Sequence, residues 1–342
     1  MSHMPRGRNM MDNANFNIWQ RGATFTSPAD AARFCDRWIY TKGTAGTVTI
    51  TQDTGVPNTS SLYSMKIACT GTDTSIASND QSMIFQVLEG YTWNALYGKP
   101  MVMSFWVKSY QTGTFCMSIR TGDASFVTEY VVNASATWEK KVIVIPPATI
   151  GTWGTGTAAS AYITFCLMSG TDGQTTLTNT WKAENKWATS NQTNLYSSTN
   201  NYIQFSQVQL EAGSSATEFE ALHPADDLAR CQRYYYQTGG TTAYEMHATG
   251  WCATTSIGSV IAPIPQMRAI PTVAYTTVGD FGVAYGSNAI SACTALARAN
   301  SGSNRTCAIN ITTTATPLTA GWACMLQSNN NTSDRLTFSA EL

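Results

Sequence analysis

One segment constrains the fold more than any other part of the chain. Residues 203–213 read Ile-Gln-Phe-Ser-Gln-Val-Gln-Leu-Glu-Ala-Gly. Apolar side chains stand at Ile203 and Phe205 and, after a slip of one residue, at Val208 and Leu210. Alternation with period two predicts a half-buried strand, and the slip predicts a β-bulge at Ser206 and Gln207 that returns the apolar side chains to the same core. We expect this strand to close a β-sandwich.

The composition supports an all-β fold. Charged residues make up 12% of the chain, about half of the roughly 25% that is typical of globular proteins. Thr, Ser, Asn and Gly take their place, and these residues suit strands and tight turns. A length of 342 residues is enough for two domains.

The first domain is expected over residues 13–222 as a jelly-roll sandwich. Many short alternating segments separated by Gly and Asn predict this architecture. The strands are expected at 47–52, 63–69, 83–88, 101–108, 114–120, 126–132, 139–145, 162–168 and 202–211. Residues 101–107 are almost continuously apolar, so their strand should be central.

A long polar connection, residues 175–201, interrupts this pattern. It is dense in Thr, Asn and Ser but carries Trp181, Trp187, Leu195 and Tyr196. A loop of this length in a compact domain is either functional or mobile.

A short linker helix is expected over residues 223–237. Pro224 stands in its first turn, Asp226 and Asp227 lie near the positive end of the helix dipole, and arginines follow. Residues 238–342 then form a smaller β-sandwich. Its strands are expected at 244–254, 259–263, 272–276, 281–285, 307–312, 322–326 and 336–342. Residues 1–12 are expected to be a tag and a disordered lead, because Met-Ser-His-Met at 1–4 has the form of a cloning remnant.

Several short motifs, in order, resemble a known family. They are Asn-Phe-Asn-Ile-Trp-Gln-Arg-Gly at 15–22, Phe25, Asp-Arg-Trp at 36–38, Gly-Lys at 98–99, Ser-Phe-Trp-Val at 104–107, Thr-Trp-Glu-Lys at 137–140, the bulged strand with 216–220 and 228–236, Met-Arg-Ala at 267–269, Pro-Thr at 271–272 and residues 333–342. Together they resemble the carbohydrate-module-like β-sandwiches and fibre-tip domains of bacteriophage tail-fibre and receptor-binding proteins. The long connection at 175–201 departs from the family, in which a shorter one is expected.

The resemblance implies a location and partners. It implies a homotrimer in the virion tail fibre, with the C-terminal tip facing the host and binding a surface polysaccharide or lipopolysaccharide. Other virion tail proteins would hold the chain, and no cofactor would be needed. Two alternatives stay open, namely a capsular polysaccharide depolymerase and a purely structural decoration or joint protein of the virion.

Charge and hydropathy argue against two other classes of partner. The net charge of −1 provides no basic footprint for nucleic acid. No apolar run approaches the ~18 residues of a membrane span, so membrane insertion is not expected. The nine cysteines, none of them in a C-x-x-C pair, are expected to be buried thiols from a reducing compartment of assembly.

Catalysis is not expected. Beyond the opening segment the histidines are His223 and His247, and motifs such as G-x-S-x-G and H-E-x-x-H are missing. Paired carboxylates could cleave a glycan, but Asp226 and Asp227 are explained by the helix start. Glu211, Glu218 and Glu220 are expected on a solvated strand edge. No metal site is expected.

Glycan contacts are expected from two groups of residues. Aromatic side chains in polar loops can stack on sugar rings, although the same residues also suit subunit interfaces. These are Trp153, Trp181, Trp187 and Tyr196. Amide and guanidinium groups in apical loops of the second domain can pair with sugar hydroxyls and acidic groups. These are Asn288, Asn304, Arg305, Asn329 and Asn330.

Several large aromatic and charged residues are expected to have structural roles. Trp19, Trp38, Phe105 and Trp106 are expected in the core, and Arg21, Asp36 and Arg37 in an ion-pair network that fixes the N-terminal strand.

Overall fold

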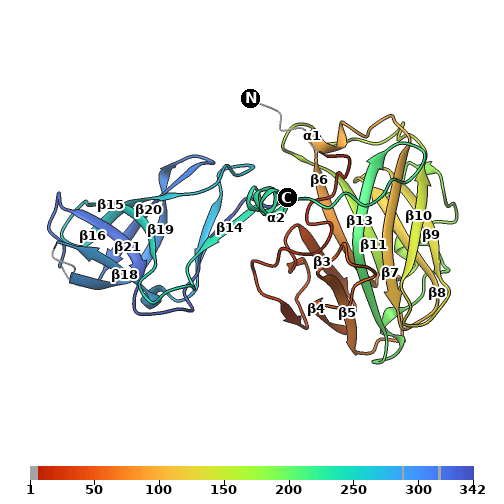
Figure 1. Cartoon of the computed structure of the whole chain (residues 1–342), viewed down its shortest axis with the longest axis horizontal. Coiled ribbons are helices and arrows are strands. Elements are labelled where there is room, and N and C mark those ends of the chain that lie inside the picture. The colour runs from red at the N-terminus through yellow and green to blue at the C-terminus, as the bar shows by residue number, and fades with distance from the viewer. Residues whose placement is uncertain (1–6, 287–288, 315–316) are drawn as a thin grey trace. The chain divides into compact units, whose positions relative to one another are not determined.

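The computed structural model describes residues 7–286, 289–314 and 317–342. The chain divides into two compact units, one comprising the residues up to Leu228 together with Leu342, the other comprising residues 229–341. We call them the sandwich unit, red to green in Figure 1, and the barrel unit, blue-green to blue. Both are built almost entirely of antiparallel strands, so the all-β prediction is confirmed.

The sandwich unit consists of two sheets. Sheet A has the order β1 (Thr24–Thr26), β4 (Thr47–Asp53), β5 (Ser64–Gly71), β13 (Tyr202–Ala212), β7 (Met101–Ser109) and β10 (Glu139–Ile145). Sheet B has the order β12 (Trp181–Lys182), β9 (Ser125–Val132), β8 (Gly113–Arg120), β11 (Ala159–Ser169), β6 (Gln81–Glu89), β3 (Trp38–Gly43) and β2 (Ala32–Arg33). From β5 to β8 the chain alternates between the sheets, as in a jelly roll.

The expected strands of this unit are all present. The period-two alternation of apolar side chains explains why these segments form strands. Inward residues of both sheets form one continuous core that includes Trp38, Ile84, Phe105, Phe165 and Phe205. β7 lies one strand from the edge of sheet A rather than at its centre. Trp106 is a correction: its side chain lies outside this core and is partly exposed, because its neighbours Phe105 and Val107 occupy the inward positions.

The predicted bulge is confirmed. The register of β13 against β7 shifts between Ser206 and Gln209, and Gln207 has a φ of 51°. Ile203, Phe205, Val208 and Leu210 are all fully buried in the same core.

The bulge also explains why the N-terminal lead is not disordered throughout. It frees the Val208 N–H to donate to the Ala14 carbonyl at 2.9 Å, and Met10 N–H donates to the Leu210 carbonyl at 2.9 Å. Met11 is fully buried, and Asp12 pairs with Arg37 at 3.2 Å. The disordered lead expected over residues 1–12 is therefore wrong for residues 9–12, which are part of the sandwich.

The expected charge network near the start is present. Arg21 Nη1 lies 3.6 Å from Asp36 Oδ1, and Gln20 donates to both oxygens of the Asp36 carboxylate. Arg37 Nη2 donates to the Val87 carbonyl at 2.6 Å. These contacts attach residues 12–21 to strands β3 and β6.

The barrel unit is all-β but is not a second sandwich. Six strands close into a barrel in the order β15 (Met246–Cys252), β16 (Ile257–Pro263), β20 (Thr306–Thr313), β19 (Ala289–Gly302), β18 (Phe281–Tyr285) and β21 (Ala323–Ser328). β14 (Tyr235–Thr238), β22 (Leu336–Ser339) and β17 (Thr272–Tyr275) form a separate three-stranded sheet. The tip-sandwich expectation is corrected here, because β19 pairs with both β18 and β20 and completes the ring.

Short helical segments complete the description. They are α1 (Gly90–Trp93), η1 (Thr171–Gly173), η2 (Leu195–Ser197), α2 (Pro224–Gln232) and η3 (Val278–Asp280). The linker helix is α2, which ends at Gln232 rather than at 237, so Tyr235 and Tyr236 belong to a strand. In the part of the chain described, no helix is long and apolar enough to cross a membrane.

All nine cysteines lie in described positions. Each is buried, and none of them forms a disulfide. Burial raises the pKa of the Cys35 and Cys166 thiols well above the ordinary value. Reactive thiolates need the opposite environment, so the expectation of buried thiols is confirmed.

Candidate functional site

Part of the long connection at 175–201, around Trp187 and Gln192, is folded onto the outer face of sheet B. Ala188 and Trp187 pack on the buried thiols of Cys116 and Cys166. Gln192 Oε1 accepts the Cys116 N–H at 2.7 Å, and Asn179 N–H donates to the Val127 carbonyl at 2.9 Å. The connection is thus an ordered cover over part of this face.

Beside this cover, four side chains form a partly exposed surface that we call the arginine platform: Phe85, Arg120, Tyr162 and Trp187. Arg120 on β8 stands directly opposite Tyr162 on β11. The Arg120 guanidinium carbon lies 5.2 Å from the Tyr162 ring centre, 5.6 Å from that of Trp187 and 5.9 Å from that of Phe85. Three strands and the cover therefore place three rings around one cation.

Hydrogen bonds fix the guanidinium. Arg120 Nη1 donates to Asn185 Oδ1 at 3.1 Å, and Nε donates to Thr164 Oγ1 at 3.3 Å. Burial lowers the pKa of Arg120, but a guanidinium stays charged at any physiological pH. Neighbouring outward residues such as Ser118 and Thr164 are fully buried, so the platform is the accessible part of this region.

The platform combines residue types that can contact a sugar. Aromatic faces stack on the apolar face of a pyranose, and a planar guanidinium with a nearby amide offers donors and acceptors to hydroxyl groups. Sequence reasoning found only Trp187. Phe85, Arg120 and Tyr162 were missed because they lie on different strands, although bulky side chains at outward strand positions were a usable signal.

Trp153 and Trp181 are brought together at another place. Their ring centres are 5.7 Å apart, and Trp153 lies 4.4 Å from the buried Trp93. Trp153 Nε1 donates to the Ile150 carbonyl and Trp181 Nε1 to the Pro146 carbonyl, both at 2.9 Å. Both are partly buried and hold the 146–153 loop in place, which is a packing role.

Tyr196 cannot contact a glycan in this structure. Its side chain is fully buried, and its hydroxyl lies 2.8 Å from that of Tyr40 and 2.6 Å from Ser82 Oγ. The polar surroundings of Tyr196 in the sequence concealed a core position, and the expectation is corrected.

The four described candidates of the C-terminal domain lie at one end of the barrel, next to the three-stranded sheet. Asn304 Nδ2 donates to the Met267 carbonyl at 3.0 Å, and Arg305 Nη2 to Gln266 Oε1 at 2.8 Å. Asn329 Nδ2 donates to the Gly279 carbonyl at 3.2 Å, whereas Asn330 is exposed with a φ of 53°.

Those expected apical loops are therefore turns that pack on neighbouring loops of the barrel unit. The turn at 253–256 and the Trp322 region lie at the opposite end of the barrel, as the pairing of β15 with β16 and β21 requires. Asn288 lies outside the described residues.

The histidines have structural surroundings. The Ala225 N–H donates to His223 Nδ1 at 3.2 Å at the start of α2. His247 Nε2 lies 2.8 Å from Asp334 Oδ2 and 3.3 Å from Ser328 Oγ, and all three residues are buried. The other ring nitrogen, Nδ1, lies 2.8 Å from Thr238 Oγ1, so the buried ring is held between one carboxylate and two hydroxyl groups.

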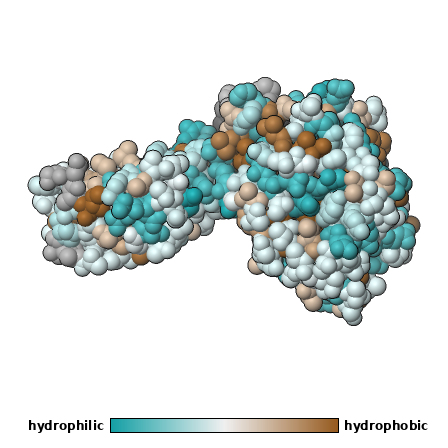
Figure 2. Space-filling view, turned by 60° about the horizontal axis from the view of Figure 1, so that its bottom comes forward, coloured by the Kyte–Doolittle hydropathy of each residue, from teal (hydrophilic) through white to brown (hydrophobic). Residues whose placement is uncertain are grey.

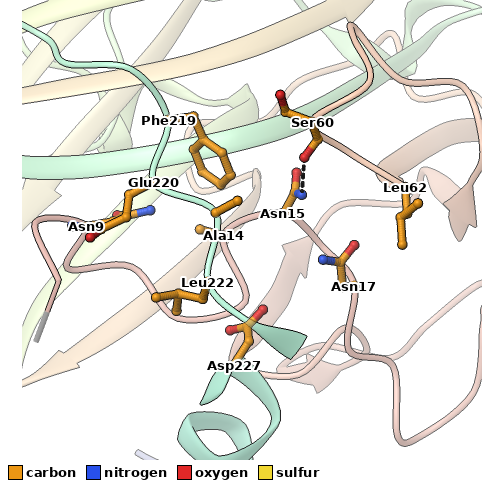
Figure 3. A pocket seen from close by; sticks show the side chains of 11 residues that line it. Asn9, Ala14, Asn15, Asn17, Ser60, Leu62, Phe219, Glu220, Leu222 and Asp227 are labelled. Carbon is orange, nitrogen blue, oxygen red and sulfur yellow. Dashed lines mark hydrogen bonds between the residues drawn. The ribbon is translucent and has the colours of Figure 1, made fainter. Parts of the chain in front are cut away.

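A small cavity of about 160 Å³ lies at the surface of the sandwich unit, between the N-terminal segment and residues 219–227 (Figure 3). Glu220 accepts the Asn9 N–H and Asp227 accepts the Asn13 N–H, both at 2.9 Å. Asn15 donates to the Ser60 carbonyl at 3.1 Å. The polar groups of this cavity thus join three chain segments.

Among the residues described, no three His, Cys, Asp or Glu side chains gather to hold a metal ion.

Comparisons with known proteins give similarities of fold. No family model and no curated protein sequence matches the chain. Tailspike protein 4 of bacteriophage CBA120, in its enzymatically active domain, is 15% identical with a TM-score of 0.33, over 60% of this chain and 22% of that one. The family 11 carbohydrate-binding module of a Clostridium thermocellum cellulase is 13% identical with a TM-score of 0.30, over 58% of this chain and 100% of that one. A CBM4 structure is 15% identical with a TM-score of 0.33, over 59% and 99%. Similarity at this level assigns no residue a role.

Proposed function

We propose that the chain is a bacteriophage tail-fibre or receptor-binding protein, and that it binds a polysaccharide or lipopolysaccharide of the host surface through the arginine platform. The observation that carries the proposal is the cation at Arg120 enclosed by the rings of Tyr162, Trp187 and Phe85 at 5.2–5.9 Å. The virion assignment is supported by the ordered series of motifs along the sequence.

The proposed role is adhesion without catalysis. One site of this size binds a saccharide weakly, and repeated copies on one particle raise the overall affinity. The carboxylates of Glu220 and Asp227 accept main-chain N–H groups, which is a structural use. In this proposal the protein acts outside the cell, on the virion tail fibre, and needs no cofactor.

The proposal includes assembly into a homotrimer and attachment to other tail proteins. Residues 246–263 and 306–328, which form four of the six barrel strands, contain no Asp, Glu, Lys or Arg. On the outside of these strands Trp251 is 48% exposed and Ile261 46%. Depletion of charge with exposed Trp is characteristic of subunit interfaces.

A screen of bacterial surface polysaccharides tests the proposal. The purified chain is expected to bind a subset of immobilised polysaccharides and to release no new reducing ends from them. Release of reducing ends would favour a depolymerase, and binding to virion proteins without any saccharide would favour a structural joint.

A further inference from the structure

The outer face of sheet A carries a second concentration of charge and aromatic rings. Lys66 on β5, Gln204 on β13 and Lys108 on β7 are direct neighbours across three adjacent strands. We call these three residues the lysine row. Strands lie about 4.8 Å apart, so the two lysine backbones are separated by roughly 10 Å. Both side chains start from the same side of the sheet.

The charged ends of the row converge above Gln204. A Cβ atom placed on Gly55 would lie 3.5 Å from Lys108 Nζ, 3.8 Å from Gln204 Nε2 and 2.9 Å from Asp53 Oδ1. Lys66 Nζ lies 3.9 Å from the other oxygen of Asp53. Gly55 and Asp53 cover Gln204, which is buried, so the partly exposed lysine side chains are the accessible part of the row.

The positive charge there is incompletely balanced. Asp53 is one carboxylate for two ammonium groups, and at 3.9 Å on a half-exposed surface its pairing with Lys66 is weak. Within the described chain, Lys108 Nζ makes no hydrogen bond and no ion pair. Burial, together with the like charge of Lys66, lowers the pKa of Lys108 against the attraction of Asp53. A bound anion would relieve this repulsion.

Aromatic rings flank the row on both sides. Lys66 Nζ lies 4.8 Å from the ring centre of Tyr202, whose ring lies 6.3 Å from that of Tyr110. Lys108 Nζ lies 5.2 Å from the ring centre of Trp138. Trp138 and Tyr202 are partly exposed and Tyr110 is exposed. Rings beside cations suit a ligand that has an apolar ring face and a negative group.

We infer that the lysine row and its flanking rings bind an acidic saccharide, with the carboxylate of a uronic acid between Lys66 and Lys108 and its pyranose ring against Tyr202 or Trp138. The carboxylate accepts from both ammonium groups, while the buried Gln204 keeps its hydrogen bond from Nε2 to Ser64 Oγ at 3.3 Å. The inference rests on the proposed glycan-binding function, but it uses the opposite sheet from the arginine platform.

Titration of the full chain with trigalacturonic acid, and with galactotriose as a neutral match, tests this site. The acidic trisaccharide is expected to bind at least tenfold more tightly than the neutral one at low salt, with the advantage shrinking as salt rises. Lys66→Gln and Lys108→Gln are each expected to weaken the acidic probe about tenfold. Lys99→Gln removes the same charge from an exposed turn and is expected to leave its affinity unchanged.

Other results overturn the inference. Equal affinity for the two probes, no binding of the acidic one, or equal losses in Lys99→Gln and Lys108→Gln would each contradict it. Tyr162→Ala separates this failure from a failure of the proposed function. If trigalacturonic acid binding is lost in Tyr162→Ala but survives both lysine variants, the lysine row is not the site while the arginine platform stands.

Discussion

At the scale of single residues, polar side chains in this protein mostly hold the chain in place, and only a few are left to face a ligand. Asn304, Asn329 and Tyr196 share a polar sequence context, and each is engaged in an internal hydrogen bond. Arg120 also makes internal bonds, but its ring of partners stays partly exposed. A side chain is a candidate for binding a ligand when it stays exposed after making its internal hydrogen bonds. Residue type alone does not separate such a side chain from a structural one.

Tyr196→Phe tests the structural role of the buried hydroxyl. The change leaves Tyr40 and Ser82 without a shared partner in the core. We expect a loss of about 2 kcal/mol in the free energy of unfolding, measured by urea denaturation, with saccharide binding unchanged. A loss of binding in a protein of unchanged stability would restore Tyr196 to the site.

Glu139 should make the sandwich unit sensitive to acid. Burial raises the pKa of Glu139, but hydrogen bonds from Lys141, Ala134 and Asn133 outweigh it and lower the pKa to about 2. Because the folded pKa lies below the unfolded one, the stabilisation is present above about pH 4.5 and is lost as the pH falls towards 2. Glu139→Gln is expected to flatten this part of the stability profile, measured by thermal unfolding from pH 2 to 6. An unchanged profile would contradict the assignment.

At the scale of elements, the sequence predicted those strands in which apolar and polar side chains alternate regularly. Nine strands of the sandwich unit and the bulge at Gln207 follow from period-two alternation, whereas β1, β2, β3 and β12 were not expected. β19 was not expected because its run of Ala, Ser and Thr carries few large apolar residues, so it shows no contrast between its two faces. The platform could not be predicted because β6, β8 and β11 become neighbours only through sheet pairing.

Gly173→Ala tests the cover over sheet B. A Cβ on Gly173 would overlap the Trp187 ring, so the ring must shift from its position beside Arg120. We expect a roughly tenfold loss of saccharide affinity in a folded protein, measured by calorimetry. Gly122→Ala is the matched control, because a Cβ there meets no atom within 4 Å. Equal affinities of the two variants would show that Trp187 does not contribute.

At the scale of the whole molecule, the surface carries two kinds of exposed chemistry. On the face shown in Figure 2, hydrophobic side chains gather in small groups among hydrophilic and neutral ones. The platform and the lysine row combine aromatic rings with cations. The barrel exterior instead exposes apolar side chains, and residues 246–263 contain no charged residue. In our proposal the first kind of surface binds saccharides and the second contacts other copies of the chain.

Ile261→Lys tests the assembly. A charge on the barrel exterior would be buried in a trimer at high cost. We expect the wild-type chain to have the mass of a trimer by light scattering, and Ile261→Lys to have a smaller mass while keeping its β-sheet circular dichroism. Ile76→Lys, at a residue 41% exposed in the sandwich unit, is expected to stay trimeric. A wild-type protein that is monomeric at all concentrations would contradict the proposal.

The most direct test of the central claim compares Tyr162→Ala with Tyr91→Ala against a polysaccharide that the wild-type chain binds. Both tyrosines are accessible on the sandwich unit, but only Tyr162 lies beside Arg120, at 5.2 Å. Isothermal titration is expected to show about a tenfold or greater loss of affinity for Tyr162→Ala and none for Tyr91→Ala. Unchanged affinity in Tyr162→Ala would contradict the assignment of the arginine platform as the glycan-binding site.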